Sequence, residues 1–94
     1  MEGTIEIRHR PEQERFETEL DGHHAVLNYR LAAGCMVIDH VGVAPAIEGR
    51  GIAGRLTQAA LAWARLSGVK VRPLCSYAAA WMRRHPDCHD LHAD

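Results

Sequence analysis

Acidic residues are absent from a long part of this 94-residue chain: residues 49–86 contain no aspartate and no glutamate. The same segment carries a formal charge of +7, whereas the rest of the chain has four basic and twelve acidic residues. The net charge is nevertheless only −1. This balance argues against a general nucleic-acid-binding protein, and the segregated charge points instead to a local anion site. The basic residues of the segment are Arg50, Arg55, Arg65, Lys70, Arg72, Arg83 and Arg84.

Other features are scarce as well. Three widely spaced cysteines argue against a disulfide framework and favour a reducing cytoplasm. No apolar run approaches the ~20 residues that span a bilayer, and residues 1–4 lack the basic and apolar regions of a signal peptide. The chain has only two Trp, two Tyr and one Phe, too few to form an aromatic platform for nucleic-acid bases. We therefore expect a cytoplasmic protein that is not bound to membranes.

The remaining composition fits one folded domain. A hydrophobic fraction of 47% supports a compact core, and 94 residues leave too little surface for a second one, so we expect a single domain over residues 1–94. Alternating apolar residues predict strands over 15–20, 25–31 and 36–43. A short edge strand is expected around Ile5 and Ile7, ending at Pro11.

The second half of the chain changes period. Apolar residues recur at helical spacing over 50–67, and Gly68 provides a stop signal. A short strand follows over 69–72, and Ser76 is a candidate cap for a last helix that ends near Arg84. Short links make the first four strands antiparallel, whereas the helix makes a right-handed crossover to a parallel fifth strand. The predicted fold class is therefore α+β.

Residues 49–54, Gly-Arg-Gly-Ile-Ala-Gly, form a glycine turn at the start of the predicted long helix. A dinucleotide site would need a carboxylate roughly twenty residues further on, and no acidic residue occurs before Asp87, so that interpretation is excluded. One remaining interpretation is a tight turn in which glycine only relieves crowding. The other is a phosphate site made by exposed amides at a helix N-terminus, flanked by arginine.

Residues 43–53 resemble the acetyl-coenzyme A signature of the GNAT acetyltransferase superfamily. Gly51, Ile52 and Ala53 fall on the last three motif positions, whereas Glu48 departs from the usual glutamine or arginine. A longer resemblance, over about residues 15–91, is to the small YjdJ-like subfamily, although Val41 replaces a common threonine. It rests on Arg15-Phe16-Glu17, His40-Val41-Gly42-Val43, Pro73-Leu74-Cys75-Ser76-Tyr77 and Arg84-His85-Pro86-Asp87.

This resemblance implies a reduced GNAT fold without two N-terminal helices, and an acetyltransferase that uses acetyl-coenzyme A. The turn amides from Gly49 through Gly51 and Ile52 to Ala53, helped by Arg50, would hold the pyrophosphate. The pantetheine arm would lie along the strand at 36–43, near Val41 and Val43. A backbone N–H there would polarise the thioester carbonyl as an acceptor, most plausibly an amine, attacks it.

Three side chains are candidate catalytic residues, each with a structural alternative. Cys75 precedes the last helix, whose N-terminus stabilises a thiolate, and the resemblance places a nucleophile there; the alternative is a cysteine packed as a small hydrophobe. His40 is a candidate general base, or a hydrogen-bonded core histidine. Tyr77 would protonate the departing thiolate, or pack the last helix on the sheet.

The C-terminal residues His85, Cys88, His89 and His92 have a spacing like that of zinc ligands, but no second ligand pair lies upstream. We therefore expect a solvated tail and no metal. Two rivals to the enzyme stay open: a non-catalytic module that binds or senses acyl-coenzyme A, and a basic-faced domain that contacts nucleic acid. The sequence does not define the acceptor. We expect a monomer, in which the substrate side is open, or a weak homodimer, in which a second subunit completes it.

Overall fold

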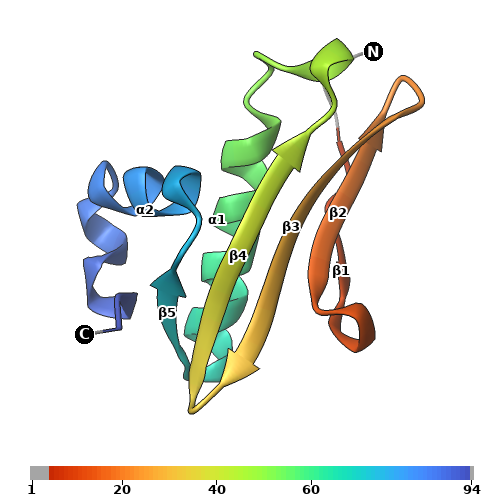
Figure 1. The fold of residues 1–94 in the computed structure, drawn as a ribbon. Coiled ribbons are helices and arrows are strands. Elements are labelled where there is room, and N and C mark those ends of the chain that lie inside the picture. Colours follow the sequence, from red (N-terminus) through yellow and green to blue (C-terminus); the bar gives the residue numbers. More distant parts are fainter. Residues whose placement is uncertain (1–4, 94) are drawn as a thin grey trace.

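One mixed sheet, in the order β1-β2-β3-β4-β5, forms the framework of the structure (Figure 1). The computed structural model describes residues 5–93, so residues 1–4 and 94 of the expected domain lie outside the described part. Three antiparallel pairs join β1 to β4, and β5 pairs in parallel with β4, which confirms the predicted α+β class and topology. The elements are β1 (Arg8–Arg10), β2 (Arg15–Leu20), β3 (His23–Ala32), β4 (Cys35–Val43), α1 (Ile52–Ser67), β5 (Lys70–Pro73) and α2 (Ser76–Arg83), with 3-10 helices η1 (Pro11–Gln13), η2 (Pro45–Ile47) and η3 (Pro86–Leu91).

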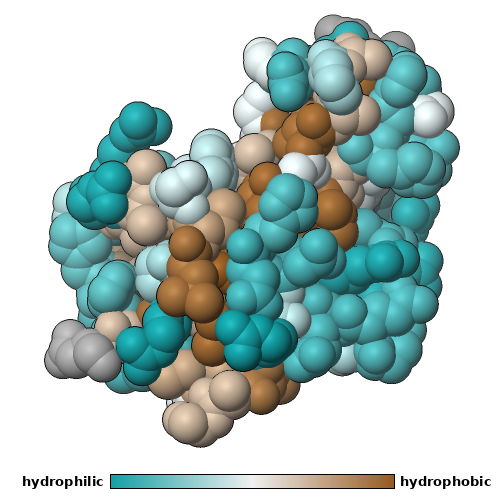
Figure 2. Space-filling view, viewed as in Figure 1, coloured by the Kyte–Doolittle hydropathy of each residue, from teal (hydrophilic) through white to brown (hydrophobic). Residues whose placement is uncertain are grey.

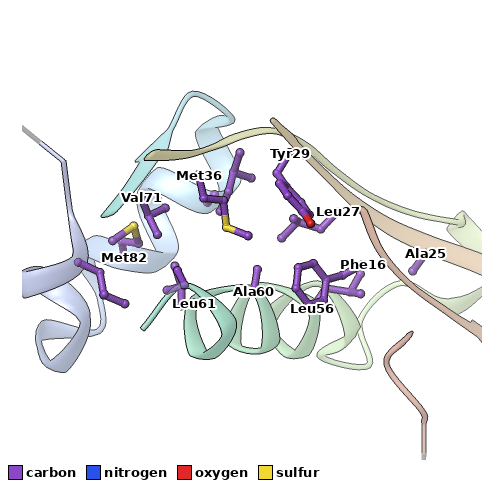
Figure 3. Close-up of a cluster of buried hydrophobic side chains, with 14 of the residues drawn as sticks. Phe16, Ala25, Leu27, Tyr29, Met36, Leu56, Ala60, Leu61, Val71 and Met82 are labelled. Carbon is purple, nitrogen blue, oxygen red and sulfur yellow. The ribbon is translucent and has the colours of Figure 1, made fainter. Parts of the chain in front are cut away.

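The hydrophobic core lies between α1 and one face of the sheet. Helix α1 buries an apolar stripe because its apolar residues recur every three or four positions. Figure 3 shows Leu56, Ala60 and Leu61 of α1 pointing toward strand residues that include Leu27 and Met36. Each large apolar side chain buried in this way contributes about 1.5–3 kcal/mol. Helix α2 adds Met82 to the same core.

The opposite face of the sheet is free of helices over its middle strands. Figure 1 shows α1 behind β3 and β4, with β5 and α2 to one side of them. The same view in Figure 2 is mostly hydrophilic over β2 and β3, with an apolar band beside it. Neither helix of the described residues has the length and apolar character needed to cross a membrane.

A bulge in β4 divides that strand into two halves. The register passes from Tyr29↔Ile38 to Asn28↔His40, so Asp39 is an extra residue on β4. Strand β5 pairs with β4 only as far as Ile38, because Pro73 ends the ladder. Beyond that point, the amides of the two following residues both donate to the carbonyl of Ile38, at 3.0 and 3.1 Å. The second half of β4 therefore has an edge without a strand partner.

Two local predictions were wrong. The first strand lies at Arg8–Arg10 and not at Ile5 and Ile7, which pack against the core outside any strand. His9 occupies the inward position instead, with its ring stacked on Phe16 at 4.0 Å between centroids. The N-cap of α2 is Cys75, with no side-chain capping bond, because Ser76 is already the first helical residue.

The C-terminal segment is not a solvated tail. The six residues of η3 follow α2 after a two-residue link, and Leu91 is only 6% exposed. The amide of Ala93 donates to the carbonyl of Val71 at 2.8 Å, which covers part of the outer edge of β5. Arg65 of α1 holds the same segment through the carboxylate of Asp90 at 2.8 Å. The polar composition concealed these anchors, which a prediction based on periodicity does not detect.

Candidate cofactor site

A pocket of about 350 Å³ lies where β4, the glycine turn and α1 meet. Its volume is within the range of small-molecule sites. Residues from η2, the glycine turn, β4 and α2 line this cofactor pocket, and they are far apart in sequence. They are Val41, Val43, Ile47, Glu48, Gly49, Gly51, Ile52, Ala53, Gly54 and Tyr77. Six of the seven residues predicted to bind the cofactor line this pocket, four from the turn and the start of α1 and two valines from β4. Arg50 does not line it.

The glycine turn has a backbone conformation that favours glycine at two positions. Gly49 has φ = +80° and Gly51, the N-cap of α1, has φ = +76°. A residue with a side chain would lose about 1–2 kcal/mol in this left-handed region. Two such residues in close succession turn the chain sharply from η2 into α1.

The amides of the glycine turn have no acceptor in the described part of the chain. The first bond of α1 runs from the amide of Arg55 to the carbonyl of Gly51 at 3.1 Å. Within residues 5–93, no hydrogen bond is donated by the amides of residues 49–54, and neither a capping side chain nor an acidic residue occupies the first turn of α1. Unpaired amides at the positive end of a helix dipole suit a phosphate group.

The second half of β4 forms another wall of the cofactor pocket. Val41 and Val43 pair across the sheet with Leu27 and Ala25, two buried residues that face α1. The two valines therefore point toward the helix layer and line the pocket. Because β5 has already left β4 at this level, an extended ligand has access to the edge of the strand beside them.

Gly54 brings α2 close to the first turn of α1. A Cβ at this position would lie 3.3 Å from Nε1 of Trp81 and 3.5 Å from the hydroxyl of Tyr77. Glycine thus permits the approach that places the Tyr77 hydroxyl at the cofactor pocket. Burial raises the pKa of Tyr77, with a smaller opposing effect from Arg84. The phenol is therefore a proton donor at neutral pH.

Cys75 lies near the pocket but does not line it. As the N-cap of α2, it is half-buried, and its amide donates to the carbonyl of Ile38 at the point where β5 leaves β4. Its side chain packs partly against the core. Cys75 is two residues before Tyr77 in the chain. Its half-buried environment suits a packing role as well as a catalytic one.

His40 and Arg50 lie away from the cofactor pocket. His40 follows the bulge on the face of β4 opposite Val41, and its ring covers Gly42, where a Cβ would be 2.6 Å from Nε2. The side chain is exposed, so the alternative of a core histidine is wrong. Arg50 is exposed too, and its Nη1 lies 3.3 Å from a carboxylate oxygen of Asp21.

The C-terminal histidines are held by the main chain. Nδ1 of His85 lies 2.7 Å from the carbonyl of Trp81, and Nε2 of His89 lies 3.0 Å from the carbonyl of Met82. Among residues 5–93, no three His, Cys, Asp or Glu side chains are grouped to hold a metal ion. The two nitrogens contribute to the packing of η3 against α2.

Three pocket residues were not predicted, and one of them, Ile47, is completely buried. Glu48 was identified only as a departure from the motif, although its place directly before the turn was a signal that it would reach the site. Gly54 was noted as part of the turn, but its contact with Tyr77 depends on how α2 packs, and sequence spacing does not contain this information.

Comparisons with known proteins identify the family and support the fold. The family model described as "GCN5-related N-acetyl-transferase" matches residues 15–91. The chain belongs to this family. Protein NATD1 of Mus musculus is 32% identical to this chain over 87 residues, which cover 89% of the chain and 79% of the mouse protein. A solved structure of a GCN5-like putative N-acetyltransferase from Staphylococcus aureus superposes with a TM-score of 0.76 at 25% identity, covering 94% of this chain and 87% of the other.

Proposed function

We propose that this protein transfers an acetyl group from acetyl-coenzyme A to an amine or another small nucleophile. The observation that carries the proposal is a pocket formed by the unpaired amides of the glycine turn and the half of β4 that has no strand partner on the β5 side among the described residues. Membership of an N-acetyltransferase family supports the reaction class. Membership of the YjdJ-like subfamily, a cytoplasmic location and a monomeric or weakly dimeric state belong to the same proposal.

The diphosphate of the donor binds the amides of residues 49–53, at the positive end of the α1 dipole. Arg50 joins this contact by leaving Asp21, since an exposed pair at 3.3 Å contributes little stability. The pantetheine arm then extends the sheet along β4, next to main-chain groups of Val41 and Val43. This orientation directs the thioester toward Ile38, where β5 and β4 separate.

An unprotonated amine attacks the thioester carbonyl carbon, a C–N bond forms, and the C–S bond breaks. A main-chain N–H of β4 stabilises the negative charge that develops on the carbonyl oxygen. Tyr77 gives its proton to the departing sulfur, and the raised pKa of this phenol keeps that proton available. The proton that the nitrogen loses as the amide forms then restores the phenol. His40 removes the proton of the incoming ammonium on the helix-free face of the sheet.

A two-step route through Cys75 fits the same site. The thiolate of Cys75 attacks the carbonyl carbon and displaces coenzyme A, leaving an acetyl thioester on the cysteine. The amine then attacks this thioester and regenerates the thiol. Acetyl-coenzyme A without acceptor should therefore leave an acetyl group on the peptide that contains Cys75, measured by mass spectrometry. Cys88→Ser is the matched control and should keep this adduct, whereas no adduct on Cys75 would leave direct transfer.

Turnover tests the proposal as a whole. Free thiol should be released from acetyl-coenzyme A in the presence of a panel of amines, and the rate should depend on the amine supplied. Tight binding of coenzyme A without any thiol release would instead indicate a non-catalytic module that binds or senses acyl-coenzyme A. The absence of both binding and release would contradict the proposed function.

A further inference from the structure

The cofactor pocket contains an unexpected negative charge. Glu48 lines it beside the unpaired amides of the glycine turn, and it is the one ionisable carboxylate among the described lining residues. No lysine or arginine among residues 5–93 lines the pocket. The diphosphate would thus meet main-chain dipoles together with a like charge.

The backbone keeps Glu48 in this place. Its neighbour Ile47 is completely buried, and the amide of Glu48 donates to the carbonyl of Pro45 at 3.3 Å. The residue has an extended conformation with φ = −66° and ψ = 156°, and its side chain is exposed at the rim. No hydrogen bond or ion pair within the described residues neutralises the carboxylate.

The flanking cations do not offset this charge inside the pocket. Arg50 follows two positions later, but its guanidinium lies near Asp21 at the turn between β2 and β3. Arg55 is exposed on α1 and does not line the pocket. The positive charge of the segment therefore surrounds the site, whereas the one charged side chain among the described lining residues is negative.

We infer that Glu48 is a specificity-determining residue that weakens binding of the diphosphate, so that the pantetheine arm supplies a larger share of the affinity. This inference rests on the proposed function, because it assumes that the diphosphate occupies the glycine turn. Like charges at a partly exposed site repel each other by an amount that salt reduces, since the Debye length shortens as ionic strength rises. The carboxylate thus favours rapid release of coenzyme A.

Calorimetric titration with coenzyme A tests the inference. Glu48→Gln should bind coenzyme A about three- to tenfold more tightly than the natural protein at low ionic strength, and the gain should shrink in ~0.5 M salt. Glu48→Arg should show a larger increase in affinity for coenzyme A than Glu48→Gln. The matched control is Glu12→Gln in η1, which removes the same charge at the opposite end of the sheet and should change the affinity less than twofold (Figure 1).

A probe without phosphates isolates the electrostatic cause. S-acetylpantetheine, followed by NMR titration, should bind the natural protein and Glu48→Gln equally. Equal or weaker coenzyme A binding by Glu48→Gln would overturn the inference, and so would a gain that also appears with S-acetylpantetheine. If neither the natural protein nor any variant binds coenzyme A, the proposed function itself is overturned. If all bind it with the same affinity, only the inference about Glu48 is overturned.

Discussion

The two ends of helix α1 have the same kind of glycine cap but differ in how their polar main-chain groups are paired. Each is capped by a left-handed glycine, Gly51 at φ = +76° and Gly68 at φ = +75°. At the C-terminal end the chain closes on itself, because the amides of Gly68 and Val69 donate to carbonyls of the last turn at 3.3 and 3.1 Å. At the N-terminal end, the amides of residues 49–54 have no acceptor within the described residues.

The side chains around the two ends repeat this difference. Arg65 near the C-terminal end bonds both the carboxylate of Asp90 and the carbonyl of Asp87, and so fixes η3 to α1. At the N-terminal end, glycines and apolar residues border a pocket together with Glu48 and Tyr77, and no such ion pair closes it within the described residues. One end of α1 thus supports stability, whereas the other leaves polar groups available for a ligand.

The largest expected effect comes from placing the same substitution at both ends. Gly51→Glu should abolish coenzyme A binding, with a loss of more than ~100-fold, because it puts a carboxylate among the amides that hold the diphosphate. Gly68→Glu is the matched control with the same backbone strain, about 1–2 kcal/mol, and it should keep the affinity. Calorimetry measures the affinity for coenzyme A, and urea unfolding measures the stability of each variant. Equal affinities for the two variants would refute the assigned anion site.

Tyr77→Phe tests the catalytic side of the N-terminal end. Loss of the phenolic proton should lower kcat about 100-fold, the lower part of the range for general acid catalysis, with little change in coenzyme A affinity. Steady-state kinetics of thiol release separates the two quantities. A variant with natural kcat would show that Tyr77 only packs α2 against α1.

Leu91→Ala tests the C-terminal end. Truncating this buried side chain should lower the free energy of unfolding by about 2–3 kcal/mol, because η3 is part of the core. The control Leu66→Ala, in the last turn of α1 and 88% exposed, should change the free energy of unfolding by less than about 0.5 kcal/mol. Urea unfolding measures both, and a stable Leu91→Ala would restore the prediction of a solvated tail.

A smaller effect, that of pH on stability, is expected from the contact between β1 and α1. Nε2 of His9 is 2.5 Å from the hydroxyl of Tyr29, and its ring meets Trp63 of α1 edge-on. Burial lowers the pKa of His9, against a weaker opposite effect of Glu12. Because the unfolded chain binds the proton more readily, stability should be full above the ordinary pKa of about 6.5 and should fall as pH drops below it.

Urea unfolding at pH 7.5 and pH 5.5 measures this dependence. The free energy of unfolding should differ less between the two pH values in His9→Gln than in the natural protein. In His23→Gln, where the replaced side chain is exposed at the start of β3, the difference should stay the same. An unchanged pH dependence in His9→Gln would exclude His9 as a contributor.

Much of the fold follows from local patterns that the sequence displays. The predicted helix over 50–67 begins at Ile52 and ends at Ser67, since its apolar spacing and Gly68 are local signals. The three longer strands also lie within a few residues of their predicted bounds. The glycine turn was predicted to line a site from a local signal of the same kind, since its residues are consecutive, and it does line the pocket. Anion binding there stays a prediction.

What the sequence did not predict depends on contacts between distant segments. The inward position of His9 arises from its stacking on Phe16, and no periodicity of β1 contains that pairing. The folding of η3 depends on Arg65 and Ala93, and the approach of Tyr77 depends on Gly54. The exposure of His40 follows from the bulge at Asp39, which shifts the alternation of β4.

Amide NMR spectra recorded during titration with coenzyme A test the central claim most directly. The account predicts that the amide resonances of residues 49–54, together with those of Val41 and Val43, shift most, whereas those of Gly68 and Val69 stay in place. Large shifts confined to another surface, with unaltered amides in the glycine turn, would contradict it.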